Sequence, residues 1–171
     1  SEMCIRDRYW TPGILQPDSL GAVIGFTDHH TRYHLYRAII EGLCLELYMA
    51  LNIMEKRSGL HIQEIRIAGG GARSDVVCQI AADVFGLPVT RTQTHEACSI
   101  GSSMVAFVAQ GVFPDYDAAV ASMVHEKDTF LPNAENHSVY AEIYEQAYSK
   151  IYPRLRPIYR KLIGLKRRTA Q

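Results

Sequence analysis

A β-prone run that leads directly into three glycines and then into a helix constrains this sequence more than any other feature. Residues 64–68 (EIRIA) predict a strand, Gly69, Gly70 and Gly71 follow at once, and apolar periodicity predicts a helix over residues 74–85. Glycines after a strand permit positive φ and leave bare backbone accessible to a ligand. The helix N-terminus adds free N–H groups and a partial positive charge. The local pattern fits a nucleotide or phosphate site and a plain tight turn equally well.

Two well-defined phosphate loops are excluded by the residues around these glycines. A P-loop requires Gly-Lys-Ser/Thr, and the sequence contains no such tripeptide. A dinucleotide fingerprint requires a third glycine where Ser74 stands, and an acidic residue near the end of the next strand, where Thr90 and Arg91 stand. A dinucleotide-dependent oxidoreductase is therefore disfavoured.

The rest of the chain predicts strands and helices in alternation. A long helix is expected over residues 31–57, with Thr31 as its N-cap and Ser58-Gly59 as its stop. Strands joined through helices by short connections imply parallel pairing, hence an α/β layered fold. The other predicted elements are strands at 22–27 and 87–91 and helices at 97–110, 114–124 and 137–162.

Composition bounds the function classes. The 171 residues carry 18 basic and 18 acidic side chains, so a general affinity for nucleic acid is not expected. No apolar run reaches the length of a membrane span. The four scattered cysteines (Cys4, Cys44, Cys78 and Cys98) predict reduced thiols in a cytoplasmic protein. The length suits one domain, or one half of a two-lobed protein.

The first residues do not look like the start of a domain. Residues 1–8 (SEMCIRDR) have neither helical nor strand periodicity, and Pro12, Gly13 and Pro17 mark a loop after them. We therefore expect the chain to be a C-terminal fragment, with residues 1–8 unrelated to its fold.

Five motifs in order resemble the C-terminal domain of the FGGY carbohydrate kinases, over residues 9–165. They are YWTP (9–12), GAVIGF (21–26), HLYRAIIEG (34–42), IAGGGARSD (67–75) and THEACSIGSS (94–103). A second family signature maps onto Gly21, Val23, Gly25, His34, Ala38 and Glu41. The resemblance implies an actin-like ATPase (ribonuclease H-like) lobe with a mixed sheet flanked by helices. Residues 166–171 would form a basic tail.

The resemblance also implies a function and a site. FGGY kinases transfer the γ-phosphoryl group of ATP, with Mg²⁺, to a sugar or polyol hydroxyl. Gly69, Gly70, Gly71 and Ser74 would form the adenine-nucleotide site, and the helix from residue 97 would pack behind the turn. In relatives the catalytic aspartate and most sugar contacts precede the YWTP motif, so no residue here is assigned as catalytic. The chain alone would be inactive.

A rival interpretation keeps the same fold without catalysis, as a nucleotide-sensing or dimerisation module. A homodimer is left open in either case. What precedes Tyr9 in the intact gene product separates the two: an upstream lobe with an aspartate and a Gly-Thr phosphate loop would favour the kinase.

Several other residues invite functional interpretations that we weigh against simpler ones. His30 and His34 have metal-ligand spacing, but they are better explained as polar residues at a helix start. Glu41 is expected to serve a structural hydrogen bond, and Asp75 to complement the dipole of its helix. Tyrosines recur every four residues, which predicts a packed helix face more than a partner surface. These tyrosines are Tyr140, Tyr144, Tyr148 and Tyr152. Pro153 and Pro157 are expected to kink or end that helix.

Overall fold

The computed structural model describes residues 20–169, with side chains up to residue 165. The chain divides into two compact units. One unit comprises residues Ile62–Ala134, and the other combines the segment up to His61 with the segment from Glu135 onward. No helix in the described range is long and apolar enough to cross a membrane.

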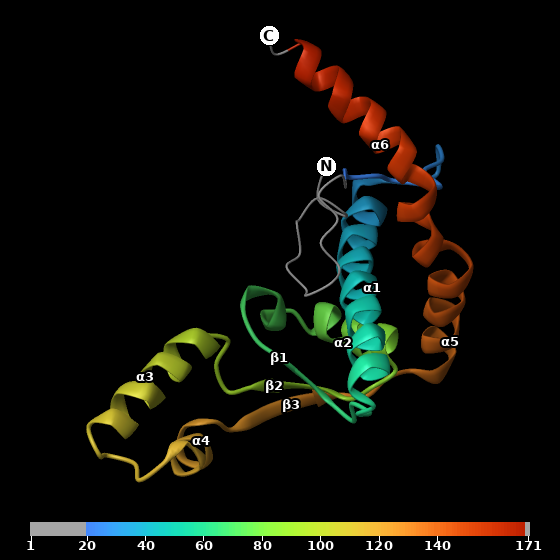
Figure 1. Ribbon diagram of the computed structural model, residues 1–171. Coiled ribbons are helices and arrows are strands. Elements are labelled where there is room, and N and C mark those ends of the chain that lie inside the picture. Colours follow the sequence, from blue (N-terminus) through green and yellow to red (C-terminus); the bar gives the residue numbers. More distant parts are fainter. Residues whose placement is uncertain (1–19, 170–171) are drawn as a thin grey trace. The chain divides into compact units, whose positions relative to one another are not determined.

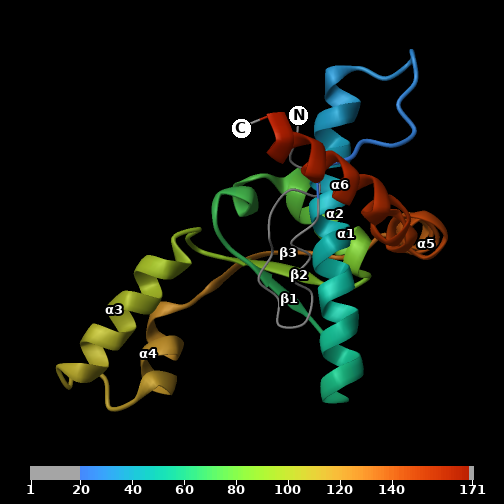
Figure 2. The same ribbon diagram turned by 45° about the horizontal axis from the view of Figure 1, so that its top comes forward.

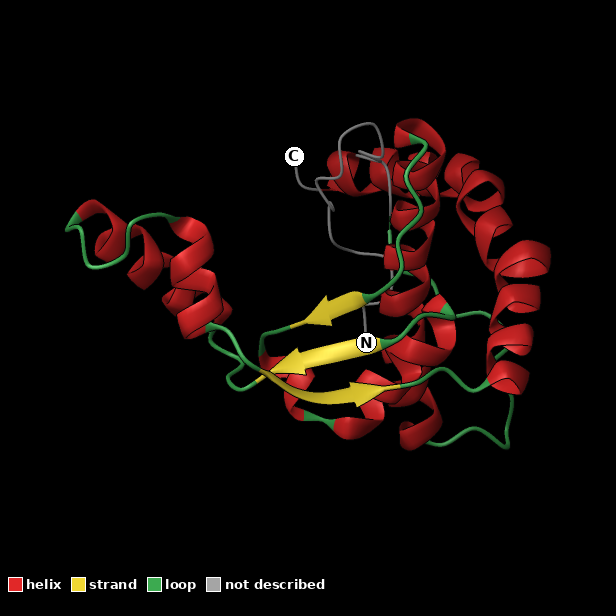
Figure 3. Cartoon of the chain, turned by 90° about the horizontal axis from the view of Figure 1, so that it is seen from below, coloured by secondary structure: helices red, strands yellow, loops and turns green. Residues whose placement is uncertain are grey.

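A small mixed sheet forms the centre of the Ile62–Ala134 unit (Figures 1 and 3). Its strand order is β1 (Ile65–Ile67), β2 (Val89–Thr92) and β3 (Glu126–Phe130). β1 and β2 are parallel, as predicted, and β2 pairs antiparallel with β3. Helix α2 (Asp75–Phe85) connects the parallel pair and ends at Gly86, whose φ of 66° is left-handed.

Helix α2 and strand β2 together supply most of the core of this unit. Both contain fully buried apolar side chains, which pack the helix onto the sheet. The buried residues of α2 and β2 are Cys78, Ile80, Ala81, Ala82, Asp83, Val84, Val89 and Thr90.

Strand β3 is missing from the sequence-based prediction. Its residues, EKDTF, are mostly charged or polar and carry no apolar alternation. They are held by pairing with β2, in a register that sets Val89 opposite Phe130 and Arg91 opposite Asp128. A strand stabilised chiefly by its partner leaves little local signal.

Helices α3 (Ala97–Ala109) and α4 (Tyr116–Met123) pack against each other beyond the end of the sheet (Figure 2). Both agree with the predicted helices, and α4 is capped by Asp115, whose Oδ1 accepts the N–H of Ala118 at 2.8 Å. The expectation that the helix from residue 97 packs behind the glycine turn is wrong for this structure, because α3 packs on α4 and makes no comparable contact with η1 or α2.

The second unit is built from long helices. Helix α1 (Arg32–Ser58) begins after Thr31 and ends at Gly59, as predicted. The predicted helix 137–162 is three consecutive segments: α5 (Ala134–Ile143), the π-helical turn η2 (Tyr144–Tyr148) and α6 (Ser149–Thr169).

The tyrosine stripe packs against α1, as the simpler interpretation predicted. The Tyr140 hydroxyl donates to Glu41 Oε1 at 2.7 Å, which also confirms a structural hydrogen bond for Glu41. The Tyr148 hydroxyl donates to the carbonyl of Gly42 at 3.0 Å. The Tyr144 ring meets Tyr48 edge-on, with 5.1 Å between centroids. These hydrogen bonds and the ring contact pack this tyrosine face against α1.

Pro153 and Pro157 do not end the last helix. Both lie inside α6, which continues to Thr169 and so includes the backbone of most of the predicted basic tail. Each proline removes one backbone hydrogen bond. Within α6, Tyr159 is buried and its ring lies 6.5 Å from that of Tyr152.

The predicted strand at residues 22–27 is wrong. Within the described part of this segment no strand forms, and Val23, Ile24 and Phe26 are all more than two-fifths exposed. Gly25 has a φ of 83°, which breaks the extended backbone. β propensity without a neighbouring strand does not make a strand.

The burial of the thiols gives a first prediction. Burial, and secondarily the charge of Glu41, raises the pKa of Cys44 to about 11, and burial also raises the pKa of Cys78. Cys98 is exposed. We expect iodoacetamide at pH 8 to modify Cys98 rapidly and the two buried thiols only after unfolding, as measured by peptide mass spectrometry on a Cys4→Ser chain. Equal labelling of Cys44 and Cys98 in the folded chain would contradict this burial pattern.

Candidate functional site: an open glycine turn and a basic hollow

The glycine turn lies at the carboxyl end of β1. Gly69 has φ 87° and ψ −173°, a backbone conformation that only glycine adopts readily. Its N–H donates to the carbonyl of His95 at 2.9 Å, which joins the turn to the segment after β2. Residues Gly70–Arg73 then form a single 3-10 turn, η1, that leads into α2.

The turn is not filled by neighbouring side chains. A Cβ atom built on Gly69 or on Gly70 would have no heavy atom within 4 Å, apart from those of adjacent residues. A Cβ on Gly71 would lie 3.7 Å from Val77 Cγ1, an ordinary contact. The backbone of Gly69 and Gly70 is therefore open to a flat ligand.

Ser74 joins the turn to the helix as the N-cap of α2. Its Oγ accepts the N–H of Val77, with an O···N distance of 3.5 Å. Asp75 follows in the first helical turn, as predicted. The four site residues expected from the resemblance thus lie together along one short segment, from Gly69 to Ser74.

Arg91, at the end of β2, fastens this segment to the sheet. Its Nη1 donates to the carbonyl of Ala72 at 3.1 Å and pairs with Asp75 at 2.8 Å, while its Nε donates to Asp128 at 2.6 Å. The Arg91 side chain is only 15% exposed and its guanidinium lies 5.3 Å from the centre of the Phe130 ring. The hydrogen bond to Asp128, followed by that to Asp75, raises the pKa of Arg91, so the cation is permanent.

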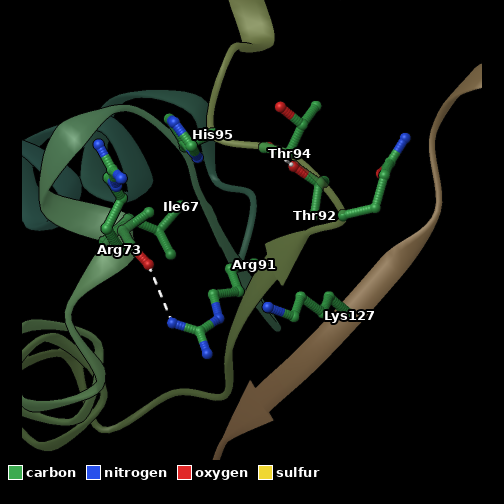
Figure 4. Close-up of a pocket in the computed structure, with 9 residues that line it drawn as sticks. Ile67, Arg73, Arg91, Thr92, Thr94, His95 and Lys127 are labelled. Atoms are coloured by element: carbon green, nitrogen blue, oxygen red, sulfur yellow. Dashed lines mark hydrogen bonds between the residues drawn. The ribbon is translucent and has the colours of Figure 1, made fainter.

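A hollow of about 210 Å³ opens beside the turn, between the ends of β1 and β2 and the start of β3 (Figure 4). Three cationic side chains line it: Arg73, Arg91 and Lys127. Four further polar residues contribute to its wall: Thr92, Gln93, Thr94 and His95. The apolar lining comes from Ile67 and Ala72. We call this cavity the basic hollow.

The basic hollow begins where the predicted site ends. It is bordered by Ala72 and Arg73 of the turn, whereas Gly69, Gly70, Gly71 and Ser74 are not among its lining residues. Sequence reasoning missed Arg73, Arg91 and Lys127. For Arg91 a signal existed, because a polar residue that ends a strand parallel to β1 must point near the same sheet edge. For Lys127 there was none, since β3 itself was not predicted.

The described residues contain no group of three or more His, Cys, Asp or Glu side chains arranged to hold a metal ion. His34 instead accepts the N–H of Thr31 through Nδ1 at 3.1 Å, at the start of α1. The rings of His30 and His34 meet edge to face at 5.6 Å. The helix-start interpretation of these two histidines is thereby supported.

Comparison with known proteins identifies the family. Residues 9–110 match the C-terminal domain of the FGGY family of carbohydrate kinases, and the chain belongs to this family. A xylulose kinase of Staphylococcus epidermidis is 32% identical over 145 residues, which are 85% of this chain and 29% of that protein. A glycerol kinase of Dechloromonas aromatica is 36% identical over 125 residues, 73% of this chain and 24% of that protein.

Solved structures agree on the fold. The crystal structure of xylulose kinase from Rhodospirillum rubrum matches with a TM-score of 0.70 and 26% identity, over 83% of this chain and 28% of that one. The mixed sheet with flanking helices is therefore an actin-like lobe of the FGGY type. The chain spans less than a third of the length of these relatives.

Proposed function

We propose that this chain is the adenine-nucleotide-binding lobe of an ATP-dependent carbohydrate kinase. In the whole protein the γ-phosphoryl group of ATP would pass to a hydroxyl of a sugar or polyol. The observation that carries the proposal is the open backbone of Gly69 and Gly70 at the amino end of α2, where a purine base can lie against main chain. Relatives named xylulose kinase and glycerol kinase support the substrate class.

The residues fit an adenine nucleotide in three respects. Gly70 offers space on its exposed face, Gly69 holds the positive φ that turns the chain, and Ser74 presents a hydroxyl at the helix N-terminus. Arg91 acts as a positioning residue, because it holds the carbonyl of Ala72 and so fixes the exit of the turn. ATP would supply the transferable phosphoryl group.

Mg²⁺ would arrive with the triphosphate. The carboxylate nearest the turn, Asp75, is paired with Arg91. This lobe would therefore bind the base, while the catalytic aspartate, most of the sugar contacts and the ligands that complete the Mg²⁺ shell would lie in the rest of the protein. We propose residues 9–165 as the extent of the lobe and the cytoplasm as its location, the latter on the free thiols of Cys44, Cys78 and Cys98 in the described part of the chain.

Calorimetric titration of the chain with ATP and Mg²⁺ tests this proposal. We expect saturable binding that adenosine alone reproduces in large part, because the site contacts the base. We expect no sugar-dependent ADP production from the chain alone. Absence of any adenosine binding by the folded chain, established by circular dichroism, would contradict the nucleotide site.

The same titration bears on the rival function. A nucleotide-sensing or dimerisation module would bind nucleotide without any change when the upstream lobe is supplied. A kinase would gain sugar-dependent turnover on joining that lobe, so assay of the full-length reading frame with xylulose and glycerol separates the two.

A further inference from the structure

The basic hollow holds more positive charge than its own fold requires. Arg91 is neutralised by Asp75 and Asp128, with N···O distances of 2.8 and 2.6 Å. Lys127 Nζ lies 3.9 Å from Asp128 Oδ2, a separation too long for a strong ion pair in this partly exposed setting. The three cations that line the hollow are therefore offset by only two carboxylates, Asp75 and Asp128.

Arg73 has no ion pair among the described residues, although it lies directly after the glycine turn. It borders the basic hollow from the turn, and Lys127 reaches in from β3 toward Arg91. Figure 4 shows the Arg73 guanidinium on the His95 side of the hollow, turned away from Arg91. Arg73 belongs to η1 and Lys127 to a strand paired with β2, so separate elements bring these cations to one cavity.

The remaining wall supplies hydroxyl, amide and imidazole groups. Thr92 Oγ1 donates to the carbonyl of Thr94 at 2.7 Å, and the Gln93 amide is held by the carbonyl of Met123 at 2.6 Å. These bonds fix the segment after β2. A cavity of about 210 Å³ has several times the ~30 Å³ that one water molecule occupies in the liquid, so it can admit a multi-atom group.

We propose that the basic hollow binds a phosphoryl oxyanion, held by Arg73 and Lys127 beside the fixed cation Arg91. Arginine and lysine carry the charged N–H donors that suit phosphate oxygens, and three cations against two carboxylates leave an excess of positive charge that attracts an anion. The anion has two sources: the phosphates of a nucleotide bound at the adjacent turn, or a separate phosphate-bearing molecule. The inference goes beyond the proposed function and does not require it.

Inorganic phosphate is the probe, titrated into the 171-residue chain at constant ionic strength and followed by phosphorus NMR and calorimetry. We expect saturable binding that Arg73→Gln and Lys127→Gln each weaken by about 10-fold, because each removes a charge-assisted hydrogen bond. The matched controls are Arg154→Gln and Lys150→Gln, exposed cations on α6, which should leave binding unchanged.

Competition of ATP and of adenosine with phosphate identifies the source of the anion. If ATP displaces phosphate and adenosine does not, the nucleotide's own phosphates occupy the hollow; if neither displaces it, the anion belongs to a separate molecule. Phosphate binding without adenosine binding would contradict the proposed function and leave this inference standing. Absence of saturable phosphate binding, or equal losses in the control variants, would overturn the inference.

Discussion

Replacing Gly70 by valine is expected to weaken adenosine and ATP binding by about 10- to 100-fold, the equivalent of losing the contact of one base face. The isopropyl group would project into space that is open in the structure, since a Cβ at this position meets no atom within 4 Å. The loss would therefore come from occupation of the ligand's place, and the fold should tolerate the side chain.

Gly70 is a better position than Gly69 for a substitution that tests binding of the base. The φ of 87° at Gly69 would strain any other residue, so a substitution there would confuse misfolding with lost binding. Gly164→Val is the matched control, because Gly164 is also surrounded by open space but belongs to α6 in the other unit. Calorimetry with adenosine measures both variants. Unchanged adenosine affinity in Gly70→Val, with circular dichroism identical to the parent chain, would show that the base does not bind at this turn.

The sequence predicts those elements whose conformation is decided by neighbouring residues, and misses those that depend on distant ones. The strand, glycines and helix of residues 65–85 form one local unit whose boundaries follow from caps and apolar spacing, and β1, Gly69, Ser74 and α2 all agree with prediction. The extended conformation of β3 depends on its pairing with β2, in which Arg91 and Asp128 are 37 residues apart in the sequence. No local pattern encodes that pairing.

Two segments of the other unit depart from their local preference. Residues 22–27 have the composition of a strand but form none and remain exposed, whereas α6 continues through Pro153 and Pro157. In neither segment does local preference alone decide the structure. The basic hollow is a third instance, because its cations come from η1, β2 and β3 and meet only when the sheet has formed.

Asp83 is the residue whose loss should cost the Ile62–Ala134 unit most. Its side chain is buried, with 4% relative exposure, on the face of α2 that meets the core. Its Oδ1 accepts the backbone N–H of Asn133 at 2.9 Å and the Nε2 of Gln79 at 2.8 Å. Gln79 Nε2 also donates to the carbonyl of Leu131 at 2.9 Å, so the pair clamps α2 to the segment that follows β3.

Asp83→Ala is therefore expected to lower the free energy of unfolding by about 2–3 kcal/mol, because it removes both hydrogen bonds that the buried carboxylate accepts, from Asn133 and from Gln79. Asp83→Asn keeps an oxygen at the same position and should cost less than about 1 kcal/mol. The control, Asp28→Ala, removes a carboxylate that is 88% exposed and should change stability by no more than about 0.5 kcal/mol. Urea unfolding followed by circular dichroism measures all three. If the alanine and asparagine variants were equally destabilised, the carboxylate charge, and not the acceptor it offers to Asn133, would be the stabilising element.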